Sequence, residues 1–435
     1  MKYTFMGGVH PYDGKELSKD KEIRVYEPKG EVAIFLSQHI GAPAKALVKK
    51  GDRVLKGQLI AEAGGFVSAN IHSSVSGTVK AIDKRRTPTG DMADAVIIDN
   101  DGLFESVDFE EVADPSKLSG EEILKRISAA GIVGMGGAGF PTQVKLAPKE
   151  PDKIDHIIAN CAECEPYLTS DYRMMLEHGD ELVGGMEIIL SLFPNAKGVI
   201  AIEDNKPDCI EHMGKLCEGH DRISVYPLIT KYPQGSERQL INAVTKRRVT
   251  SKMLPADAGC IVNNADTMIA VYRAVAKGEP LIERIVTMTG NGIEEPVNLQ
   301  VPIGTQLTEL IEAAGGAKEG VEKIICGGPM MGFAMFDTGA YVTKTTSALL
   351  FMKEDQVSKE EPSPCINCGR CVDACPSRIL PVKLAVLADN GDEEAFREYN
   401  GMECMECGCC SYVCPAKRQL TQSIKTMRRQ CMRKK

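Results

Sequence analysis

CINCGRCVDACP, residues 365–376, and CMECGCCSYVCP, residues 404–415, are the two stretches that decide how the C-terminal part of the chain folds. Both follow the pattern C-x2-C-x2-C-x3-C-P, which is the bacterial ligand spacing for a pair of 4Fe-4S clusters. Three cysteines of each run bind one cluster, and the fourth, ahead of the proline, crosses to the other cluster. We therefore expect one cluster on Cys365, Cys368, Cys371 and Cys414, and a second on Cys404, Cys407, Cys410 and Cys375.

Zinc is the alternative metal for closely spaced cysteines. A structural zinc site usually uses two separated CxxC pairs, however, and it explains neither the evenly spaced triplets nor the cysteine-proline endings. The chain has 16 cysteines and no export signal, which argues for metal ligation before disulfides. Because such clusters carry electrons, the sequence predicts that electrons pass through this protein.

The composition is that of an ordinary globular protein with several domains. Its 435 residues suffice for three or four modules of about 100–200 residues. Hydrophobic residues make up 43% and charged residues 26%, and no apolar run approaches the roughly 18 residues of a membrane-spanning helix. The start, MKYTFMGG, has neither the basic nor the apolar region of a signal peptide, so we expect the chain to stay on the cytoplasmic side.

The charge distribution disfavours one class of partner and suggests others. A formal net charge of -8 disfavours a general nucleic-acid binder. From Lys417 to Lys435, however, there are eight Lys or Arg and no acidic residue. This basic tail could meet an acidic partner protein or anionic lipid, and a solvated C-terminus is an equally good interpretation.

The first 100 residues predict an arm followed by a small β module. Residues 1–30 are polar and rich in turn residues, which favours an extended arm. In residues 31–100 short β-rich runs alternate with glycine turns. The order KKGDRVLKGQLIAEA (49–63) and SSVSGTVKAI (73–82) resembles the biotinyl/lipoyl β-sandwiches, which carry a prosthetic group on a hairpin lysine. The corresponding tip, GGFVSAN (64–70), has no lysine, so the resemblance implies a structural role.

Residues 115–285 predict a doubly wound, Rossmann-like α/β domain. Strand-like runs at 154–159, 198–202 and 223–228 alternate with helical patterns at 120–130, 181–192 and 208–217. The first of these strands runs into NCAECEP (160–166), and α/β sheets bind ligands at the carboxyl ends of their strands.

Two further segments of this domain indicate a phosphate-bearing ligand. The density of glycine in GIVGMGGAGFPT (131–142) lets backbone N–H groups approach a phosphate closely, although the segment is neither a Walker A loop nor GxGxxG. The segment IVNNADT (261–267), at the start of an expected helix, offers two amides and a threonine. These side chains could hydrogen-bond a flavin, or they could simply cap the helix.

Four motifs carry a family resemblance. GMGGAGFPTQVK (134–145), NCAECEP (160–166), GSERQL (235–240) and NNADT (263–267) occur in the order seen in the NADH-oxidising flavoprotein subunit of respiratory complex I. With the opening GGVHPYDGK (7–15), the β module and the paired cluster motifs, nearly the whole chain resembles the RnfC family of the Rnf electron transport complex. The resemblance implies a set of FMN-binding residues: Gly134, Gly136, Gly137, Gly139, Lys145, Asn160, Asn263, Asn264 and Thr267. It also implies that Phe140 lies near the nicotinamide entry and that Glu165 and Glu237 contact NADH.

The departures from the complex I pattern fall on the NADH side. Met135 replaces an arginine, Ala162 an aspartate and Cys164 a serine, and the aromatic residue expected shortly after Lys145 is missing. Cys161 and Cys164 form a CxxC beside this pocket. The pair could be redox-active, although two small buried side chains are the simpler interpretation.

The rest of the chain predicts a β module, a linker and a helical domain. Residues 286–350, with VNLQVPIGTQLTELIEAAGG (297–316), resemble the β-grasp SLBB module of the same families, which we expect to pack rather than catalyse. Residues 351–364 are charged and end in Pro-Ser-Pro, as a linker does. In residues 365–435 we expect a helical ferredoxin-like domain with Leu380, Leu384 and Leu387 on one face. Cys409 and Cys431 are not needed as ligands.

The predicted flavin and clusters complement each other chemically. NADH gives up two electrons together as hydride, whereas each cluster takes one, so a flavin is the natural converter. The resemblance implies an NADH-linked oxidoreductase that exchanges electrons between NAD(H), FMN and two 4Fe-4S clusters. It would be the peripheral subunit of an ion-translocating complex at the cytoplasmic face of the cell membrane, with the membrane subunits, the ferredoxin-type subunit of the complex and ferredoxin as partners.

Two other functions fit the same residues. A soluble flavin and iron-sulfur reductase, such as a microcompartment cobalamin reductase, would use the same modules for another acceptor. A non-enzymatic iron-sulfur carrier or scaffold would keep the clusters and lack a working flavin site. Flavin content and bleaching by NADH separate the second alternative from an enzyme.

Overall fold

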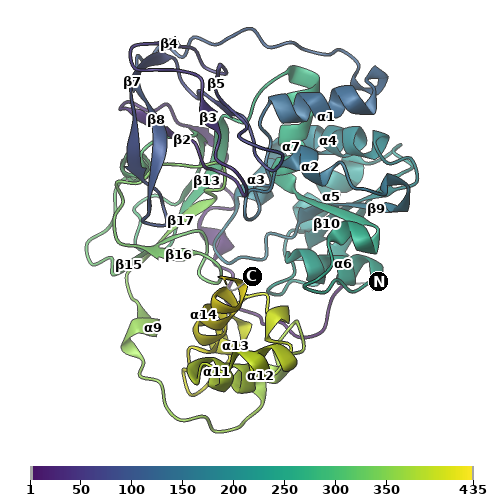
Figure 1. The fold of residues 1–435 in the computed structure, drawn as a ribbon, viewed down its shortest axis with the longest axis vertical. Coiled ribbons are helices and arrows are strands. Elements are labelled where there is room, and N and C mark those ends of the chain that lie inside the picture. The colour runs from purple at the N-terminus through teal and green to yellow at the C-terminus, as the bar shows by residue number, and fades with distance from the viewer. Residues whose placement is uncertain (1–2, 434–435) are drawn as a thin grey trace.

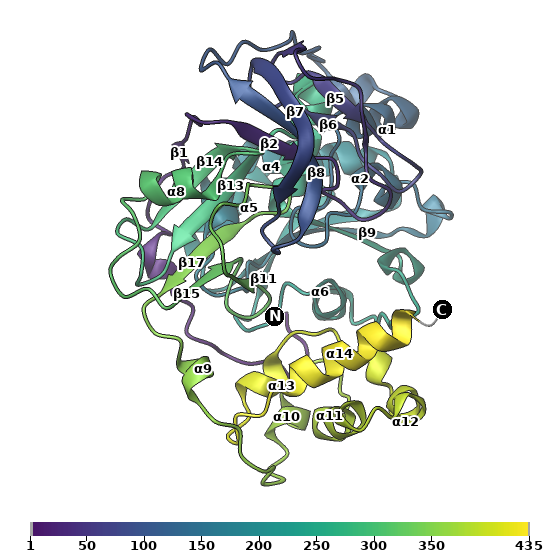
Figure 2. The same ribbon diagram turned by 60° about the vertical axis from the view of Figure 1, so that its left-hand side comes forward.

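The computed structural model describes residues 3–433, and four modules follow one another along this part of the chain (Figure 1). Two β modules and an α/β module pack together, and a helical module lies beneath them in both views (Figure 2). Among the described residues, no helix is long and apolar enough to cross a membrane.

The N-terminal module is built from two β-sheets, with strand orders β2-β8-β7-β4 and β3-β5-β6. Side chains alternate between the two faces of a strand. In β2 both faces are buried, because Val32 and Ile34 join the main core whereas Ala33 and Phe35 pack against Tyr341. The strands are β2 (Val32–Phe35), β3 (Lys45–Ala46), β4 (Arg53–Val54), β5 (Leu59–Glu62), β6 (Ile71–His72), β7 (Gly77–Arg86) and β8 (Met92–Asn100).

The α/β module has a four-stranded parallel sheet with helices on both faces. Ile157 and Ile200 belong to the core that includes α4, α5 and α7, whereas their neighbours Ile158 and Val199 belong to the core beneath α6. Burial of both faces explains why the sequence shows continuous apolar runs here. The elements are α1 (Gly120–Ala129), α2 (Thr142–Lys145), β9 (His156–Cys161), α3 (Ser170–Glu177), α4 (Gly179–Ser191), β10 (Lys197–Glu203), α5 (Pro207–Leu216), β11 (Ile223–Leu228), α6 (Glu237–Thr245), β12 (Cys260–Asn264) and α7 (Ala265–Tyr272), with single turns at Pro115–Lys117, Pro151–Lys153, Pro255–Ala258 and Arg273–Lys277.

The strand order of this sheet, β11-β10-β9-β12, sets the position of the site. The chain moves from β9 outward to β10 and β11 and then crosses back, so that β12 lies on the other side of β9. Such a reversal opens a crevice at the carboxyl ends of β9 and β12, between which the strand order reverses, and open α/β sheets bind ligands at such a point. Asn263 and Asn264, expected at the start of a helix, are the last residues of β12, and α7 begins directly after them.

The β-grasp module forms a six-stranded sheet of order β1-β14-β13-β17-β15-β16. Its first strand comes from the N-terminal arm, because Arg24 pairs with Leu299 in a parallel register. The expected extended arm thus contributes an edge strand to this module. The elements are β1 (Arg24–Val25), β13 (Glu283–Thr289), β14 (Val297–Pro302), α8 (Leu307–Ala313), β15 (Lys323–Cys326), β16 (Phe333–Met335) and β17 (Ala348–Met352).

The start of the arm joins the α/β module to the helical module. Tyr3 stacks on Tyr226 with ring centroids 4.3 Å apart. Val9 and Tyr232 exchange backbone hydrogen bonds, and Gly8 N donates to the carbonyl of Ala374 at 2.9 Å. These contacts place the start of the arm between the two modules. Farther along, the arm forms one helical turn at Lys15–Leu17, and Lys15 contacts the α/β module.

The helical module packs on its own small core. Leu384 and Leu387 are buried there, together with Phe396, Ile424 and Cys431. Leu380, expected on the same face, is 44% exposed because it caps the helix instead of lying within it. The expected linker contains one helical turn, α9. The helices are α9 (Gln356–Lys359), α10 (Arg370–Asp373), α11 (Pro381–Asp389), α12 (Glu393–Glu398), α13 (Cys409–Tyr412) and α14 (Leu420–Arg433), with one turn at Gly401–Glu403.

Candidate functional site

A cavity of about 880 Å³ lies at the carboxyl ends of β9 and β12. Its volume is in the range of small-molecule and cofactor sites, about 300–1,000 Å³. All four modules contribute to its wall. The lining residues come from 35–40 and 87–93 of the N-terminal module, 135–138, 160–171, 232–236 and Asn264 of the α/β module, Arg284, 326–333 and 343–347 of the β-grasp module, and Met405 and Cys407 of the helical module.

The glycine-rich loop is held in place at one wall of this cavity. Gly134 N donates to the carbonyl of Phe140 at 2.9 Å, and Met135 N donates to Oγ1 of Thr267 at 3.1 Å. A Cβ on Gly136 would lie 2.9 Å from Cβ of Asn264, so this position has no room for a side chain. A Cβ on Gly137 would meet no atom within 4 Å. The loop is therefore packed on one side and open to the cavity on the other.

Two asparagines from adjacent strands face the cavity side by side. Asn160 and Asn264 are register partners in the β9–β12 pairing, and both line the cavity. Asn160 Nδ2 donates to the carbonyl of Gly235 at 2.7 Å. Asn264 caps α7, because its Oδ1 accepts from the backbone N–H of Asp266 at 3.0 Å, and its Nδ2 donates one of its two hydrogens to Oδ2 of Asp171 at 2.7 Å, which leaves the second hydrogen for a ligand. Capping and ligand contact are thus compatible roles for Asn264.

The structure brings some of the predicted cofactor residues to the cavity and leaves others behind its wall. Gly136, Gly137, Asn160, Glu165 and Asn264 line the cavity. The remaining predicted residues, Gly134, Gly139, Phe140, Lys145, Glu237, Asn263 and Thr267, do not.

Among the predicted residues that do not line the cavity, Lys145 and Glu237 contact each other behind its wall. Lys145 Nζ donates to the carbonyl of Val262 at 2.8 Å and lies 3.6 Å from Oε1 of Glu237, so the predicted FMN and NADH residues Lys145 and Glu237 pair with each other. Asn263 is buried, and neither its side-chain N nor its O has a partner within residues 3–433.

Glu165 connects the α/β module to the β-grasp module. Its Oε1 accepts from the backbone N–H groups of Met330 at 2.6 Å and Met331 at 3.0 Å. A Cβ on Gly328 would lie 2.1 Å from Cγ of Glu165, which explains the glycine at that position. Burial raises the pKa of Glu165 against the lowering effect of the two N–H donors.

The CxxC of Cys161 and Cys164 consists of two small side chains that are packed against the protein. Cys161 is fully buried, and Cys164 Sγ accepts from Gly235 N at 3.2 Å. Burial raises the pKa of both thiols, so neither is a reactive thiolate at neutral pH.

Four charged residues of the cavity wall were not among the sequence predictions, and one of them is Asp91 of the N-terminal module. Asp171, in the first turn of α3, and Glu163 both line the cavity, as does Arg284 of β13. Arg284 is buried, forms an ion pair with Asp266, and its Nη1 lies 2.7 Å from Sδ of Met135. It therefore brings a guanidinium next to the position where the complex I pattern has an arginine. No local pattern marks Arg284, because β13 lies more than a hundred residues downstream of the loop.

Two smaller cavities in the helical module are lined by cysteines. One, adjoining the large cavity, is lined by Cys375, Cys404, Cys407 and Cys410 together with Cys409, which lies outside the predicted set, and the other by Cys365, Cys368, Cys371 and Cys414. The first shares Met405 and Cys407 with the large cavity, whereas the second shares no lining residue with it. The structure thus groups the cysteines in the two crossed sets expected from their spacing.

The two cysteine runs have the same backbone conformation. Left-handed residues occur at equal offsets, because Asn367, Gly369 and Arg378 in one run correspond to Glu406, Gly408 and Lys417 in the other. The backbone N–H groups of Asn367 and Glu406 each donate to the sulfur of the cysteine two residues earlier at 3.4 Å. Hydrogen bonds to cluster sulfurs are one way in which proteins tune cluster potentials.

The residues present fit the cofactors that the sequence predicts. Each cysteine set offers four free thiols around one cavity, which is the donor set of a 4Fe-4S cluster. The large cavity combines an open glycine loop with amide side chains, which suits the phosphate and ring polar atoms of a flavin.

Four basic residues of the tail form ion pairs within the protein. Lys425 and Arg428 on α14 both pair with Glu406, Lys417 pairs with Glu360, and Arg418 with Asp389. The last two lysines of the tail lie outside the described residues.

Comparison with protein families identifies the four modules. The RnfC barrel sandwich hybrid domain matches residues 3–103, the Nuo51 FMN-binding domain 127–273, the SLBB domain 285–334 and the 4Fe-4S dicluster domain 364–417. The predicted fold class and the FMN and 4Fe-4S cofactors are thereby confirmed.

Similar proteins cover almost the entire chain. The C subunit of the proton-translocating ferredoxin:NAD(+) oxidoreductase complex of Clostridium ljungdahlii is 46% identical over 98% of this chain and 94% of its own length. The C subunit of the Na(+)-translocating ferredoxin:NAD(+) oxidoreductase complex of Acetobacterium woodii is 40% identical over 98% and 97%. The C subunit of the ion-translocating oxidoreductase complex of Pseudomonas aeruginosa is 39% identical over 92% of this chain and 52% of its own length.

Among solved structures, an NAD+-reducing NiFe-hydrogenase in the H2-reduced state is similar in fold. It has a TM-score of 0.50 and 16% sequence identity, and the match covers 74% of this chain and 61% of the hydrogenase chain.

Proposed function

This chain belongs to the RnfC family, the C subunits of ion-translocating ferredoxin:NAD+ oxidoreductase complexes, and we propose that it exchanges electrons with NAD(H) at the large cavity and with protein partners at the helical module. It is an electron-transfer oxidoreductase subunit with an FMN-binding domain and a 4Fe-4S dicluster domain. When bound, FMN supplies the conversion between two-electron hydride transfer and one-electron transfer.

One observation carries this proposal. Cys407 and Met405 line both the large cavity and the small cavity of the Cys375, Cys404, Cys407 and Cys410 set. A flavin in the large cavity would therefore adjoin this proximal cluster, whereas the cluster of Cys365, Cys368, Cys371 and Cys414 would be distal. The electron path then runs from NAD(H) through FMN to the proximal and then the distal cluster, or in reverse.

Each wall of the large cavity has a separate task in this path. The loop at Gly136 and Gly137, with Asn160 and Asn264, would hold the FMN. Glu165 would keep the β-grasp loop closed over the cavity, because it binds the backbone of Met330 and Met331. The protein's task is to bind, orient and exclude water, and no nucleophile is needed.

The distal set is where a partner would take over the electrons. Cys368 is exposed and Ile366 beside it is 66% exposed, whereas Cys375 and Cys410 of the proximal set are buried. We assign ferredoxin, the ferredoxin-type subunit or a membrane subunit of the complex to this surface, with the chain peripheral on the cytoplasmic face. The names of the relatives, which specify ferredoxin:NAD+ oxidoreductase complexes, support this assignment.

Two cysteine variants test the order of the clusters. In Cys365→Ser the distal cluster should be lost, and NADH should still reduce FMN and the proximal cluster in a rapid-mixing experiment. In Cys404→Ser the proximal cluster should be lost, and NADH should reduce FMN while the distal cluster stays oxidised. Dithionite reduction of each variant, followed by electron paramagnetic resonance, serves as the control that the remaining cluster is intact.

The opposite pattern would overturn the assignment. If the distal cluster of Cys404→Ser is reduced by NADH as fast as in wild type, the proximal cluster is not on the path. If the purified wild type contains iron, lacks FMN and does not respond to NADH, the protein is an electron carrier or scaffold and not an NADH-linked enzyme.

A further inference from the structure

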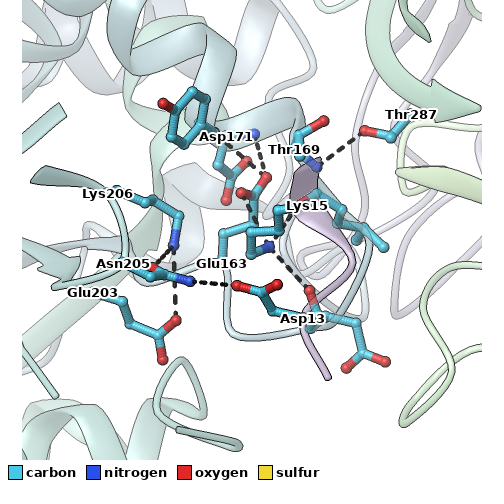
Figure 3. Close-up of polar contacts among 12 residues, drawn as sticks. Asp13, Lys15, Glu163, Thr169, Asp171, Glu203, Asn205, Lys206 and Thr287 are labelled. Atoms are coloured by element: carbon cyan, nitrogen blue, oxygen red, sulfur yellow. Dashed lines mark hydrogen bonds and ion pairs between the residues drawn. The ribbon is translucent and has the colours of Figure 1, made fainter. Parts of the chain in front are cut away.

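A group of buried acids and lysines lies beside the large cavity and is not explained by flavin or cluster binding (Figure 3). Lys15 comes from the N-terminal arm, Glu163 follows β9, and Glu203 and Lys206 lie at the end of β10 and just after it. Their exposures are 5%, 9%, 1% and 0%. Buried charges cost several kcal/mol each unless they are paired, so this arrangement calls for a reason.

Asp171, which is half-buried at the edge of this group, lines the cavity on the side of the flavin loop. Its Oδ2 accepts from Nδ2 of Asn264 at 2.7 Å, and it lines the cavity with Gly136 and Asn160. Its backbone N–H donates to Oε1 of Glu163 at 2.7 Å, so the Glu163 side chain is held against the first turn of α3. Figure 3 shows both carboxyl groups close together above the ammonium group of Lys15.

The nearby cations are committed to other acids. Lys15 Nζ lies 3.5 Å from Oε2 of Glu163 and also donates to the carbonyls of Glu165 and Leu168. Arg284 forms its ion pair with Asp266. Asp171 therefore has an amide as its hydrogen-bond donor. Burial and the negative charge of Glu163 raise the pKa of Asp171 to about 7, and the Asn264 hydrogen bond, Arg284 and Lys15 oppose this rise.

The proposed reaction requires a proton acceptor at this place. A hydride consists of one proton and two electrons, and the two clusters accept electrons only. When both electrons of one hydride have left for the clusters, one proton remains at the flavin and must move to a protein group. In the reverse direction two electrons and one proton must arrive together before a hydride can leave for NAD+.

Other titratable groups of the cavity wall are less suited to this task. The Glu165 carboxylate is occupied by two backbone N–H donors. Burial raises the pKa of Cys164 and of Tyr232 far above neutral. His39 lies on the N-terminal module, where its Nε2 contacts Ser68 and the carbonyl of Ala42.

We propose that Asp171 accepts the proton that remains at the flavin when its electrons pass to the clusters, and donates it in the reverse direction. The inference rests on the proposed function. Before the transfer the Asp171 carboxylate is charged and the flavin holds the proton. Afterwards the carboxyl group is neutral and the two electrons are on the clusters. Glu163 Oε1, which accepts from the backbone N–H of Asp171 at 2.7 Å, lies close enough for its negative charge to favour proton uptake by Asp171.

The test compares two aspartate variants in the complete, cofactor-loaded protein. Asp171→Asn keeps a side-chain oxygen that accepts from Asn264 and cannot carry the proton. Asp208→Asn is the matched control, because Asp208 is exposed in the first turn of α5 and accepts from the hydroxyl of Tyr172, away from the cavity. FMN content is measured first in all three proteins.

The main readout is the infrared difference spectrum between the NADH-reduced and the oxidised protein near neutral pH. Wild type and Asp208→Asn should gain a protonated-carboxyl band on reduction, and Asp171→Asn should lack this band. In rapid mixing, electron transfer from reduced flavin to the proximal cluster should slow by about 100-fold or more in Asp171→Asn, which is the lower end of a general acid–base contribution. The slowed step should also lose its dependence on pH.

An FMN-loaded Asp171→Asn protein with the wild-type band and rate would overturn the inference while leaving the proposed function intact. If this variant does not retain FMN, wild type labelled with 13C in the aspartate carboxyl group decides. A reduction-linked carboxyl band that shifts with the label supports the inference, and the absence of such a band overturns it. A wild-type protein without FMN, or one that NADH does not reduce, would overturn both proposals.

Discussion

Gly136→Ala is the change whose effect on FMN binding follows most directly from the geometry of the site. The backbone at Gly136 is not left-handed, so alanine meets no backbone strain there. The new Cβ would lie 2.9 Å from Cβ, 3.2 Å from Cγ and 3.3 Å from Nδ2 of Asn264. Asn264 cannot yield easily, because it caps α7 and donates to Asp171.

The magnitude follows from the cost of overpacking. Inserting a methylene-sized group into a well-packed place costs typically about 1–3 kcal/mol. If the glycine loop or Asn264 moves to relieve the contact, this free energy is lost from FMN binding. At 1.4 kcal/mol for each factor of ten, the Kd for FMN should rise by roughly 5- to 150-fold.

The assay is titration of the cofactor-free protein with FMN, followed by quenching of flavin fluorescence. Gly214→Ala is the control, because its Cβ meets no atom within 4 Å and it lies in α5, away from the cavity. Gly137→Ala should leave the cofactor-free protein as stable as wild type, since its Cβ points into open space, and should still weaken FMN binding. A Gly136→Ala protein that binds FMN within twofold of wild type would refute the reasoning about the loop and Asn264.

Three further predictions follow from other parts of the structure. Cys375→Ser should lose the same cluster as Cys404→Ser, and Cys414→Ser the same cluster as Cys365→Ser. Each variant should keep about four of about eight irons, which iron analysis and electron paramagnetic resonance can measure. If the two variants of a pair lose different clusters, the crossed sets are wrong. Lys206→Met should lower the unfolding free energy by about 3–5 kcal/mol in urea, because it leaves the buried Glu203 without the ammonium group 3.7 Å away, whereas Lys215→Met in an exposed pair should cost little. Burial raises the pKa of Asp171 and of Glu203 to about 7, so their contribution to stability is full below about pH 4 and is lost as the pH rises through about 7. The urea midpoint should fall less between about pH 5 and about pH 8 in Asp171→Asn than in wild type, and an equal fall in both would exclude Asp171 as a source.

Much of the architecture could be predicted because its signals are local. The strand at β11 has the expected bounds, Ile223–Leu228, and α1 differs from the expected helix by one residue. Both faces of the parallel strands are buried, so their apolar runs are unmistakable. The arm was harder, because Arg24 and Val25 acquire their strand conformation only by pairing with Leu299 and Gln300, far along the chain.

The sequence predicted the cavity residues that belong to motifs, but it did not predict the lining residues that lie outside them. Gly136, Asn160 and Asn264 lie at the ends of strands and in a glycine loop, where sequence patterns mark ligand sites. Lys145 was expected at the flavin; it does not line the cavity, and its Nζ donates to the carbonyl of Val262. Asp171 and Arg284 carried no such mark, because a single acid in a helix or a single arginine in a strand is usually a surface residue.

The sequence by itself determined which cofactors this protein can hold. Ligand spacing in the two cysteine runs and glycine density in the loop act over a few residues, so a short stretch of chain is enough to specify them. Only the tertiary structure decided which cluster adjoins the flavin cavity and which acid faces it. Cys407 and Met405 reach the cavity, and Lys15 reaches Glu163, through packing between modules that lie more than a hundred residues apart. Such contacts depend on how whole modules bury their surfaces against one another, and no local pattern records that.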